Sequence, residues 1–262
     1  MLKYVKLNLE NLEDEKLKIN IIKNLPALHF ILKETRRFIK LGKSIFKERE
    51  AGNIEKEKKI IYEGENLWAK NIVNHFDIPF EIIGKENIPK DGPVLFVANH
   101  QGYADILDIL YALENIQVSF VAKKEFENFP YLGKAIRITN GIFLERGNSK
   151  EAIKALREGV EILKNGYSLV IFPEGTRSKE KEMGTFKSGS LKFAQKANVP
   201  IVPITINGPY NLFEKNGYIT PVKQTLIFHE IIHYEKMDRK EQATMMPVLE
   251  DIIRKGLENI ED

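Results

Sequence analysis

The sequence predicts an α/β fold: a mixed, largely parallel central β-sheet flanked by helices, with an N-terminal basic amphipathic helical segment. Strand-like and helix-like runs alternate from about residue 63 onward, which is typical of layered α/β domains. The first 60 residues contain little strand-like sequence and carry 15 Lys and Arg against 9 Asp and Glu. We therefore expect a helical segment over 1–62 and an α/β domain over 63–262.

The N-terminal segment contains a basic amphipathic helix over about residues 28–49. Apolar residues recur at helical spacing from Leu28 to Phe46, and the other faces are rich in Lys and Arg, with only Glu34 and Glu48 as acids. This pattern is typical of a helix that lies on an anionic membrane surface. The alternatives are a helix with an ordinary solvated face and, less favoured, a nucleic-acid contact.

Seven short runs rich in β-branched and aromatic residues are predicted to be strands. Pro203 interrupts the sixth run, and because proline cannot donate to a neighbouring strand, it marks an edge, a bulge or a channel wall. In chain order the runs are Phe80–Ile83, Val94–Ala98, Val118–Ala122, Gly141–Leu144, Leu169–Phe172, Ile201–Ile206 and Thr225–Ile232.

Four helices are predicted among and after these strands, with residues that favour helix termini at their ends. Asp105 precedes the first, Gly166 follows the second, and Asp238 with Glu241 forms a potential capping box at the last. The helices are Ile106–Leu113, Ser149–Lys164, Ser188–Ala197 and Glu241–Leu257.

The composition excludes several classes of protein. The 262 residues are 43% hydrophobic, which is enough for a sizeable core, and the net charge of +3 is too small for a whole-chain nucleic-acid binder. The absence of cysteine excludes disulfides, cysteine nucleophiles and cysteine-ligated zinc. We expect no signal peptide, and no apolar run approaches the ~20 residues that span a bilayer. Any membrane contact is therefore expected from one side.

The segment NHQGYAD, residues 99–105, follows the buried-looking strand Val94–Ala98. On a continuous helix His100 and Asp105 would point ~140° apart, so they can meet only if His100 lies outside the helix that Asp105 begins. Asp105 would then fix the imidazole tautomer and leave the other ring nitrogen as a base. The alternative, which an isolated H-x4-D string favours, is a capping aspartate beside an unrelated histidine.

Three further segments could carry chemistry. FPEGTRS, residues 172–178, offers Arg177 as a planar fork for phosphate and Glu174 to orient that arginine or bind a hydroxyl, although a turn with a surface ion pair fits equally. GIFLER, residues 141–146, delivers Arg146 at the end of a strand. The segment 199–204 contains Pro203 in an apolar run.

NHQGYAD, GIFLER, FPEGTRS and VPI occur in the same order as the four motifs of the glycerolipid acyltransferases. The sequence resembles that family, and within it the 1-acylglycerol-3-phosphate (lysophosphatidic acid) acyltransferases. The resemblance implies the following roles. His100 would be the general base and Asp105 its orienting partner. The group that holds or shapes the phosphate site would be Arg146, Glu174, Gly175, Thr176 and Arg177, while Asn99 belongs to the first motif and Pro203 would line the acyl region.

The resemblance implies transfer of a fatty acyl group from acyl-CoA or acyl-carrier protein to the 2-hydroxyl of a 1-acylglycerol 3-phosphate, which yields phosphatidic acid for phospholipid synthesis. Glycerol 3-phosphate or another lysophospholipid is the alternative acceptor. No cofactor is expected beyond the acyl donor. Many relatives are membrane-bound, so we expect 1–62 to be a membrane-interface anchor that holds a peripheral protein on the cytoplasmic side. A noncatalytic membrane-binding protein is a more distant alternative.

A competing motif is HEIIH, residues 229–233, which matches the H-E-x-x-H signature of zinc hydrolases. That signature requires a helix, whereas the surrounding β-branched and aromatic residues favour a strand. In a strand His229 and His233 would stand ~13 Å apart and could not share a metal ion. Glu250 could be proposed as a third ligand, but nothing in the sequence selects it. The zinc hydrolase is therefore a distant alternative.

Overall fold

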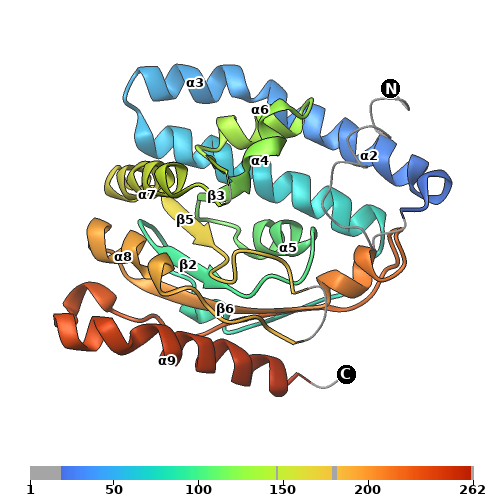
Figure 1. Ribbon diagram of the computed structural model, residues 1–262. Helices are drawn as coiled ribbons and strands as arrows, with labels where there is room; N and C mark the ends of the chain where they lie inside the picture. The colour runs from blue at the N-terminus through green and yellow to red at the C-terminus, as the bar shows by residue number, and fades with distance from the viewer. Residues whose placement is uncertain (1–18, 146, 179–181, 261–262) are drawn as a thin grey trace.

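The computed structural model describes residues 19–145, 147–178 and 182–260, and its centre is a seven-stranded sheet with the order β1-β7-β6-β2-β5-β3-β4 (Figure 1). All neighbouring strands are parallel except β6 and β7, which confirms the predicted mixed, largely parallel sheet. The strands are β1 (Phe80–Ile83), β2 (Leu95–Ala98), β3 (Val118–Lys123), β4 (Ile142–Leu144), β5 (Ser168–Ile171), β6 (Ile201–Asn207) and β7 (Gln224–Phe228).

Helices cover both faces of this sheet (Figure 1). The helices are α2 (Ile21–Lys40), α3 (Gly42–Glu50), α4 (Ile54–His75), α5 (Asp105–Ala112), α6 (Leu132–Ile138), α7 (Ser149–Lys164), α8 (Lys192–Ala197) and α9 (Arg239–Glu258). Short 3-10 turns lie at Lys85–Asn87, Lys124–Asn128, Ser188–Leu191 and Tyr234–Lys236, and a π-helix at Tyr210–Glu214. The predicted capping box of the last helix is present, with Asp238 accepting from the Glu241 backbone and Glu241 from the Asp238 backbone.

The alternation of side chains along β2 divides the interior into two cores. Phe96 and Ala98 point to a core shared with α4 and α5. Leu95 and Val97 point to the other core, which is shared with α7, α8 and α9. All four side chains are fully buried, so β2 lies at the centre of the molecule and its carboxyl end is held rigidly from both faces.

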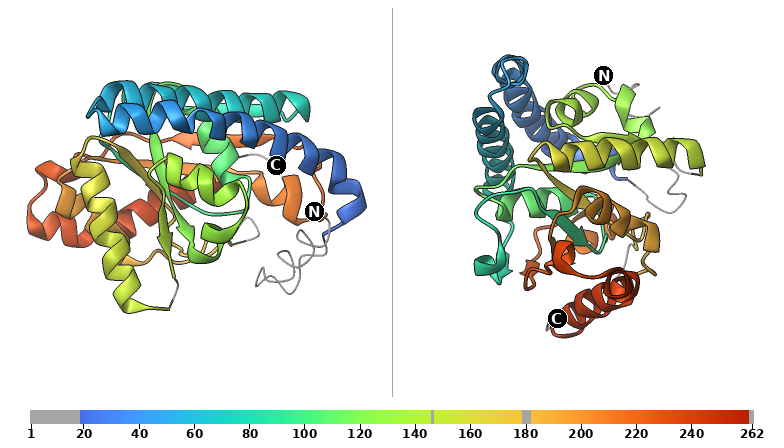
Figure 2. Two further views of the ribbon diagram at one scale, coloured as in Figure 1. Left: turned by 90° about the horizontal axis from the view of Figure 1, so that it is seen from above. Right: turned by 90° about the vertical axis from the view of Figure 1, so that its left-hand side faces the viewer.

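The N-terminal helices form an outer layer in which α2 runs beside α4 (Figure 2). The predicted single helix over 28–49 is two helices, because the chain turns at Leu41 before α3 begins at Gly42. A side chain at Gly42 would lie 3.0 Å from Ile138 of α6, so glycine permits this close packing. The domain division at residue 62 falls inside α4, which is continuous across that position. Among the described residues, none of the helices is both long and apolar enough to cross a bilayer.

Three neighbouring parallel strands, β5, β2 and β6, end at the same edge of the sheet. Pro203 lies inside β6, which is an interior strand of the sheet. The sequence-based prediction that this proline marks a sheet edge is therefore wrong. Its carbonyl accepts from the backbone of His229, and the β6–β7 pairing begins at the next residue, Ile204. The proline therefore stands where the antiparallel ladder ends, the position at which its missing N–H is tolerated.

The predicted last strand, Thr225–Ile232, is shorter in the structure because β7 ends at Phe228. Ile232 forms only an isolated antiparallel bridge with Ile201. The HEIIH segment is therefore an irregular continuation of a strand and lacks the helix that its zinc-binding signature requires.

Candidate active site

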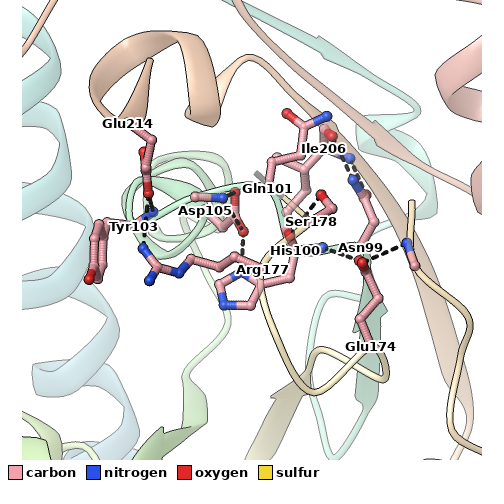
Figure 3. A network of polar contacts seen from close by, with 12 residues as sticks. Asn99, His100, Gln101, Tyr103, Asp105, Glu174, Arg177, Ser178, Ile206 and Glu214 are labelled. Atoms are coloured by element: carbon pink, nitrogen blue, oxygen red, sulfur yellow. Dashed lines mark hydrogen bonds and ion pairs between the residues drawn. The ribbon is translucent and has the colours of Figure 1, made fainter. Parts of the chain in front are cut away.

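The loops after β2, β5 and β6 meet at one edge of the sheet and form a connected polar network (Figure 3). In open α/β sheets, ligands bind at the carboxyl ends of the strands, where loops from adjacent strands converge. The network contains both of the segments with the most specific sequence signals, NHQGYAD and FPEGTRS.

His100 and Asp105 are in direct contact, as the predicted general-base role of His100 requires. Asp105 is the first residue of α5 and His100 lies in the loop before it, so the two side chains meet although a continuous helix would separate them. Nδ1 of His100 contacts Oδ2 of Asp105. The Asp105 carboxylate also accepts from the backbone N–H of Gly102, at 3.1 Å to Oδ1. The imidazole is thereby fixed with Nε2 on the opposite side of the ring.

Asp105 is completely buried beneath the histidine. Burial raises the pKa of its carboxyl group, while the neighbouring His100 and the backbone N–H of Gly102 act in the opposite direction. A buried carboxylate interacts strongly with a positive charge on His100, because little water screens the pair. The arrangement therefore holds Nδ1 of His100 against a carboxyl group and leaves Nε2 as the ring nitrogen that can act on a substrate.

His100 is held on three further sides. Its ring stacks on Phe172, with the ring centroids 4.2 Å apart. Its backbone N–H donates to Oε1 of Glu174 at 2.7 Å, and its carbonyl accepts from the backbone N–H of Ser178 at 2.7 Å. Three residues of FPEGTRS therefore fix the histidine of NHQGYAD, and the two segments form one structural unit.

Glu174 directs its carboxyl oxygens at two backbone N–H groups. It is buried, and its second carboxyl oxygen accepts from the backbone N–H of Gly184 at 2.8 Å. Burial raises the pKa of Glu174 to about 7. Glu174 thus supports the backbone of His100, because each of its carboxyl oxygens accepts from a backbone N–H group.

Arg177 is oriented by a residue that the sequence did not single out. Its guanidinium pairs with Oε1 of Glu214 at 3.2 Å and lies over the ring of Tyr103, 3.7 Å from the ring centroid. Glu214 ends the π-helix that follows β6. Neither its spacing nor a local motif distinguishes Glu214 in the sequence, whereas Tyr103 and Phe172 lie inside the recognised motifs.

The remaining predicted residues have separate placements. Gly175 adopts a left-handed conformation with φ of 71°, which favours glycine; a side chain there would lie 2.5 Å from the flexible end of Lys187, at Nζ. Thr176 is exposed beside it. Asn99 is buried and joins β2 to β6, donating to the carbonyl and accepting from the N–H of Ile206. The predicted phosphate ligand Arg146 lies outside the described residues.

A cavity of about 380 Å³ opens beside the network, and His100 and Arg177 both line it. Its walls are mainly apolar and come from α2, α4, α5, α6, β3 and the 3-10 turn that follows β3. Pro203 is not one of the lining residues, because β6 lies on the other side of β2 from β3. The apolar lining residues include Phe38, Trp68, Ile106, Leu107, Leu110, Phe120, Phe126, Phe129, Leu132, Ala135 and Ile136.

The two histidines of HEIIH have separate partners. His229 Nε2 contacts Oγ1 of Thr205 at 2.8 Å, and burial lowers its pKa. His233 Nδ1 lies 2.9 Å from a carboxyl oxygen of Glu235. Within the described part of the chain, no group of three or more His, Cys, Asp or Glu residues is arranged to hold a metal ion.

Comparison with known proteins identifies the class of protein. The family model described as "Acyltransferase" matches residues 79–207, which include the His100–Asp105 pair (the dyad), Glu174 and Arg177. The crystal structure of the 1-acyl-sn-glycerophosphate acyltransferase PlsC from Thermotoga maritima superimposes with a TM-score of 0.75 at 33% identity, covering 91% of this chain and 95% of that one. The chain therefore belongs to the glycerolipid acyltransferase family.

Its curated relatives include proteins named 1-acyl-sn-glycerol-3-phosphate acyltransferase. The one from Borreliella burgdorferi is 31% identical over 180 residues, which cover 68% of this chain and 72% of the relative. The one from Chlamydomonas reinhardtii is 35% identical over 172 residues, which cover 64% of this chain and 50% of the relative. The chain spans about half the length of this algal relative and of the chloroplastic Arabidopsis thaliana enzyme, which is 33% identical over 175 residues.

Proposed function

We propose that this protein transfers a fatty acyl group from an acyl thioester to the 2-hydroxyl of 1-acylglycerol 3-phosphate, giving phosphatidic acid for phospholipid synthesis. The observation that carries the proposal is the placement of His100, which contacts the buried Asp105, and of Arg177 on the wall of one apolar cavity. A base for a hydroxyl, a cation for a phosphate and a space for an acyl chain thus lie together. The names of the relatives support the same acceptor.

The proposed reaction follows from the orientation of the histidine. Nε2 of His100 takes the proton of the acceptor hydroxyl as its oxygen attacks the thioester carbonyl. The tetrahedral intermediate collapses, the C–S bond breaks, and the departing thiolate receives the proton from His100. Asp105 keeps the tautomer and stabilises the transient imidazolium. The transfer needs no cofactor, because the thioester is itself the activated acyl group.

Arg177 is the proposed ligand of the acceptor's phosphate, because its guanidinium lines the cavity beside His100. A planar guanidinium suits a phosphate because it offers parallel N–H donors. Anchoring this group orients the hydroxyl toward His100, which lowers the entropic part of the barrier. Glycerol 3-phosphate and other lysophospholipids share the phosphate, so they are the alternative acceptors that an assay must include.

We also propose that α2 and α3 contact an anionic membrane surface. Their exposed cationic side chains are Lys23, Lys33, Arg36, Arg37, Lys40, Lys43 and Lys47. Ile22, Leu25 and Phe46 are exposed apolar side chains on the same two helices. Thr35 and Phe38 of α2 line the cavity, so lipids held at this surface would lie near its wall. Basic side chains near an anionic surface contribute roughly 1 kcal/mol each.

The function is tested by measuring acylation with purified protein, using lysophosphatidic acid, glycerol 3-phosphate and lysophosphatidylcholine as acceptors, each with acyl-CoA and acyl-carrier protein. We expect the highest kcat/KM with lysophosphatidic acid. His100→Ala should lower the rate by ~10²–10⁴ without unfolding the protein. Full activity of His100→Ala would refute the dyad, and a preference for another acceptor would refute the substrate assignment.

The membrane contact is tested by flotation with vesicles. The triple variant Lys33→Glu, Lys40→Glu and Lys43→Glu should lose binding to vesicles rich in phosphatidylglycerol, while binding of the unaltered protein should weaken as salt is raised. Zwitterionic phosphatidylcholine vesicles serve as the control. Undiminished binding of the triple variant to anionic vesicles would remove α2 and α3 from the proposed contact.

A further inference from the structure

Glu214 enters the site from the segment after β6, whereas the two recognised motifs follow β2 and β5. It lies outside these motifs, and the proposed chemistry does not use it. It is the last residue of the π-helix Tyr210–Glu214, which follows β6 at the edge of the sheet where the dyad lies. Its side chain is only 3% exposed. A carboxylate is rarely buried to this degree unless it has a specific set of partners.

The partners of Glu214 come from both recognised motifs (Figure 3). Oε1 accepts from the backbone N–H of Tyr103 at 2.6 Å and pairs with Nη1 of Arg177 at 3.2 Å. Oε2 lies so close to Gly102 that a side chain there would come within 2.8 Å of it. Glu214 thus joins the turn that leads to Asp105 with the arginine that follows β5.

The guanidinium of Arg177 is confined on two sides. Glu214 holds its edge, and the ring of Tyr103 lies against its face at 3.7 Å. The arginine side chain is only 10% exposed, although it lines the cavity. A long, flexible side chain that is ordered before a ligand arrives loses less entropy when it binds, so these contacts preorganise Arg177.

The charge on Glu214 depends on this network. Burial raises the pKa of Glu214 to about 7, while the Tyr103 N–H and the Arg177 guanidinium favour the ionised form. Truncating Arg177 would leave the buried Glu214 carboxylate with fewer interactions that favour its charge. Truncating Glu214 would leave the Arg177 guanidinium without this carboxylate. The ion pair is therefore a coupled unit, and a change in one member should depend on the presence of the other.

We propose that Glu214 is a positioning residue that holds Arg177 at the cavity and thereby sets the affinity of the enzyme for the phosphate of its acceptor. The inference rests on the proposed function, because it takes Arg177 as the phosphate ligand. A merely structural role would instead appear as lower stability, or as a loss of kcat through the Tyr103 turn that supports the dyad.

The test is a double-mutant cycle on the full chain with Glu214→Gln, Arg177→Gln and the double variant, assayed for kcat and KM with lysophosphatidic acid. We expect Glu214→Gln to raise KM by roughly tenfold while kcat changes by no more than about twofold. In the double variant the Gln at 214 should add little to the effect of Arg177→Gln. Glu57→Gln is the matched control, since Glu57 is also buried and paired with an arginine, Arg49.

Thermal unfolding and the inhibition constant of glycerol 3-phosphate complete the test. The inhibition constant should rise in Glu214→Gln in parallel with KM and stay unchanged in Glu57→Gln, because it reports phosphate binding. The proposal is overturned by an unchanged KM, by additive effects in the double variant, or by a loss confined to kcat. Failure of the proposed function is distinct, since the unaltered enzyme would then not acylate lysophosphatidic acid or Arg177→Gln would leave KM unchanged.

Discussion

The polar network around His100 and the apolar cavity beside it are built in opposite ways. The network is a set of short hydrogen bonds between the ends of adjacent strands, and most of its members lie in NHQGYAD and FPEGTRS. The cavity wall is assembled from side chains of α2, α4, α5, α6 and β3, which lie far apart in the sequence. Reacting groups need fixed geometry, whereas an acyl chain needs only apolar volume.

Buried acids show the same difference between the two regions. In the network, Glu174 accepts from two backbone N–H groups and Glu214 pairs with Arg177. At the cavity wall, Glu65 is 5% exposed and its Oε2 has no hydrogen-bond partner among the described residues. Each of these network acids thus has at least one oxygen that accepts from a named donor, although Oε2 of Glu214 also lacks a partner among the described residues. For Glu65, burial alone raises the pKa.

The largest expected effect lies in the network. Asp105→Asn should lower kcat by roughly 10²–10⁴, because the amide cannot fix the imidazole tautomer or stabilise its positive charge. Asp108→Asn is the matched control, since Asp108 is an equally buried acid one turn later on α5 whose carboxyl oxygens have no partner among the described residues. Steady-state kinetics of both variants test whether the loss of kcat is specific to Asp105. Equal losses in the two would mean that any buried acid on α5 matters, and the dyad would lose its special role.

An intermediate effect is expected at the cavity wall. Ala135→Phe, on α6, should fill part of the cavity and shift the preferred donor to shorter acyl chains, with kcat/KM for the longest chain falling about tenfold or more. The rate with the shortest accepted donor should change little, because the dyad is untouched. Ile153→Phe, at an exposed position of α7, is the control. An unaltered chain-length profile in Ala135→Phe would show that the acyl group binds elsewhere.

The smallest expected effect concerns stability. Burial raises the pKa of Glu65 well above its ordinary value of 4.5, so the folded state binds a proton that the unfolded state releases. This contribution to stability is fully present below pH 4.5 and is lost as the pH rises toward the folded-state pKa. The melting temperature of Glu65→Gln relative to the unaltered protein should therefore increase between pH 4.5 and pH 8, with about 2–4 °C corresponding to each kcal/mol.

Melting curves of Glu65→Gln and the unaltered protein at several pH values test whether this difference in melting temperature increases with pH. Burying the amide has the same effect at every pH, so it does not change the trend. A difference between the two proteins that stays the same from pH 4.5 to pH 8 would show that Glu65 has an ordinary pKa. In that case the contrast between the two regions would not extend to their buried acids.

Most of the fold could be predicted from the sequence, because the strands and helices are short-range patterns. The helix over Ser149–Lys164 has the predicted bounds, and β1 spans Phe80–Ile83 as expected. The break at Leu41 is not predicted from the sequence; the residue that follows it, Gly42, packs closely against Ile138 of α6. His100 lies outside the helix that begins at Asp105 and contacts it, which is the arrangement that helical geometry requires if the two side chains are to meet.

The sequence by itself determined the α/β class, the positions of the dyad and Arg177, and the family, because contiguous motifs encode local geometry. Only the tertiary structure decided which acid orients Arg177, where Glu174 directs its oxygens and what encloses the cavity. Glu214 joins the site because β6 lies beside β2 and its following helix reaches the same edge. Such contacts depend on strand order, and strand order is fixed by the packing of the whole chain and not by any local pattern.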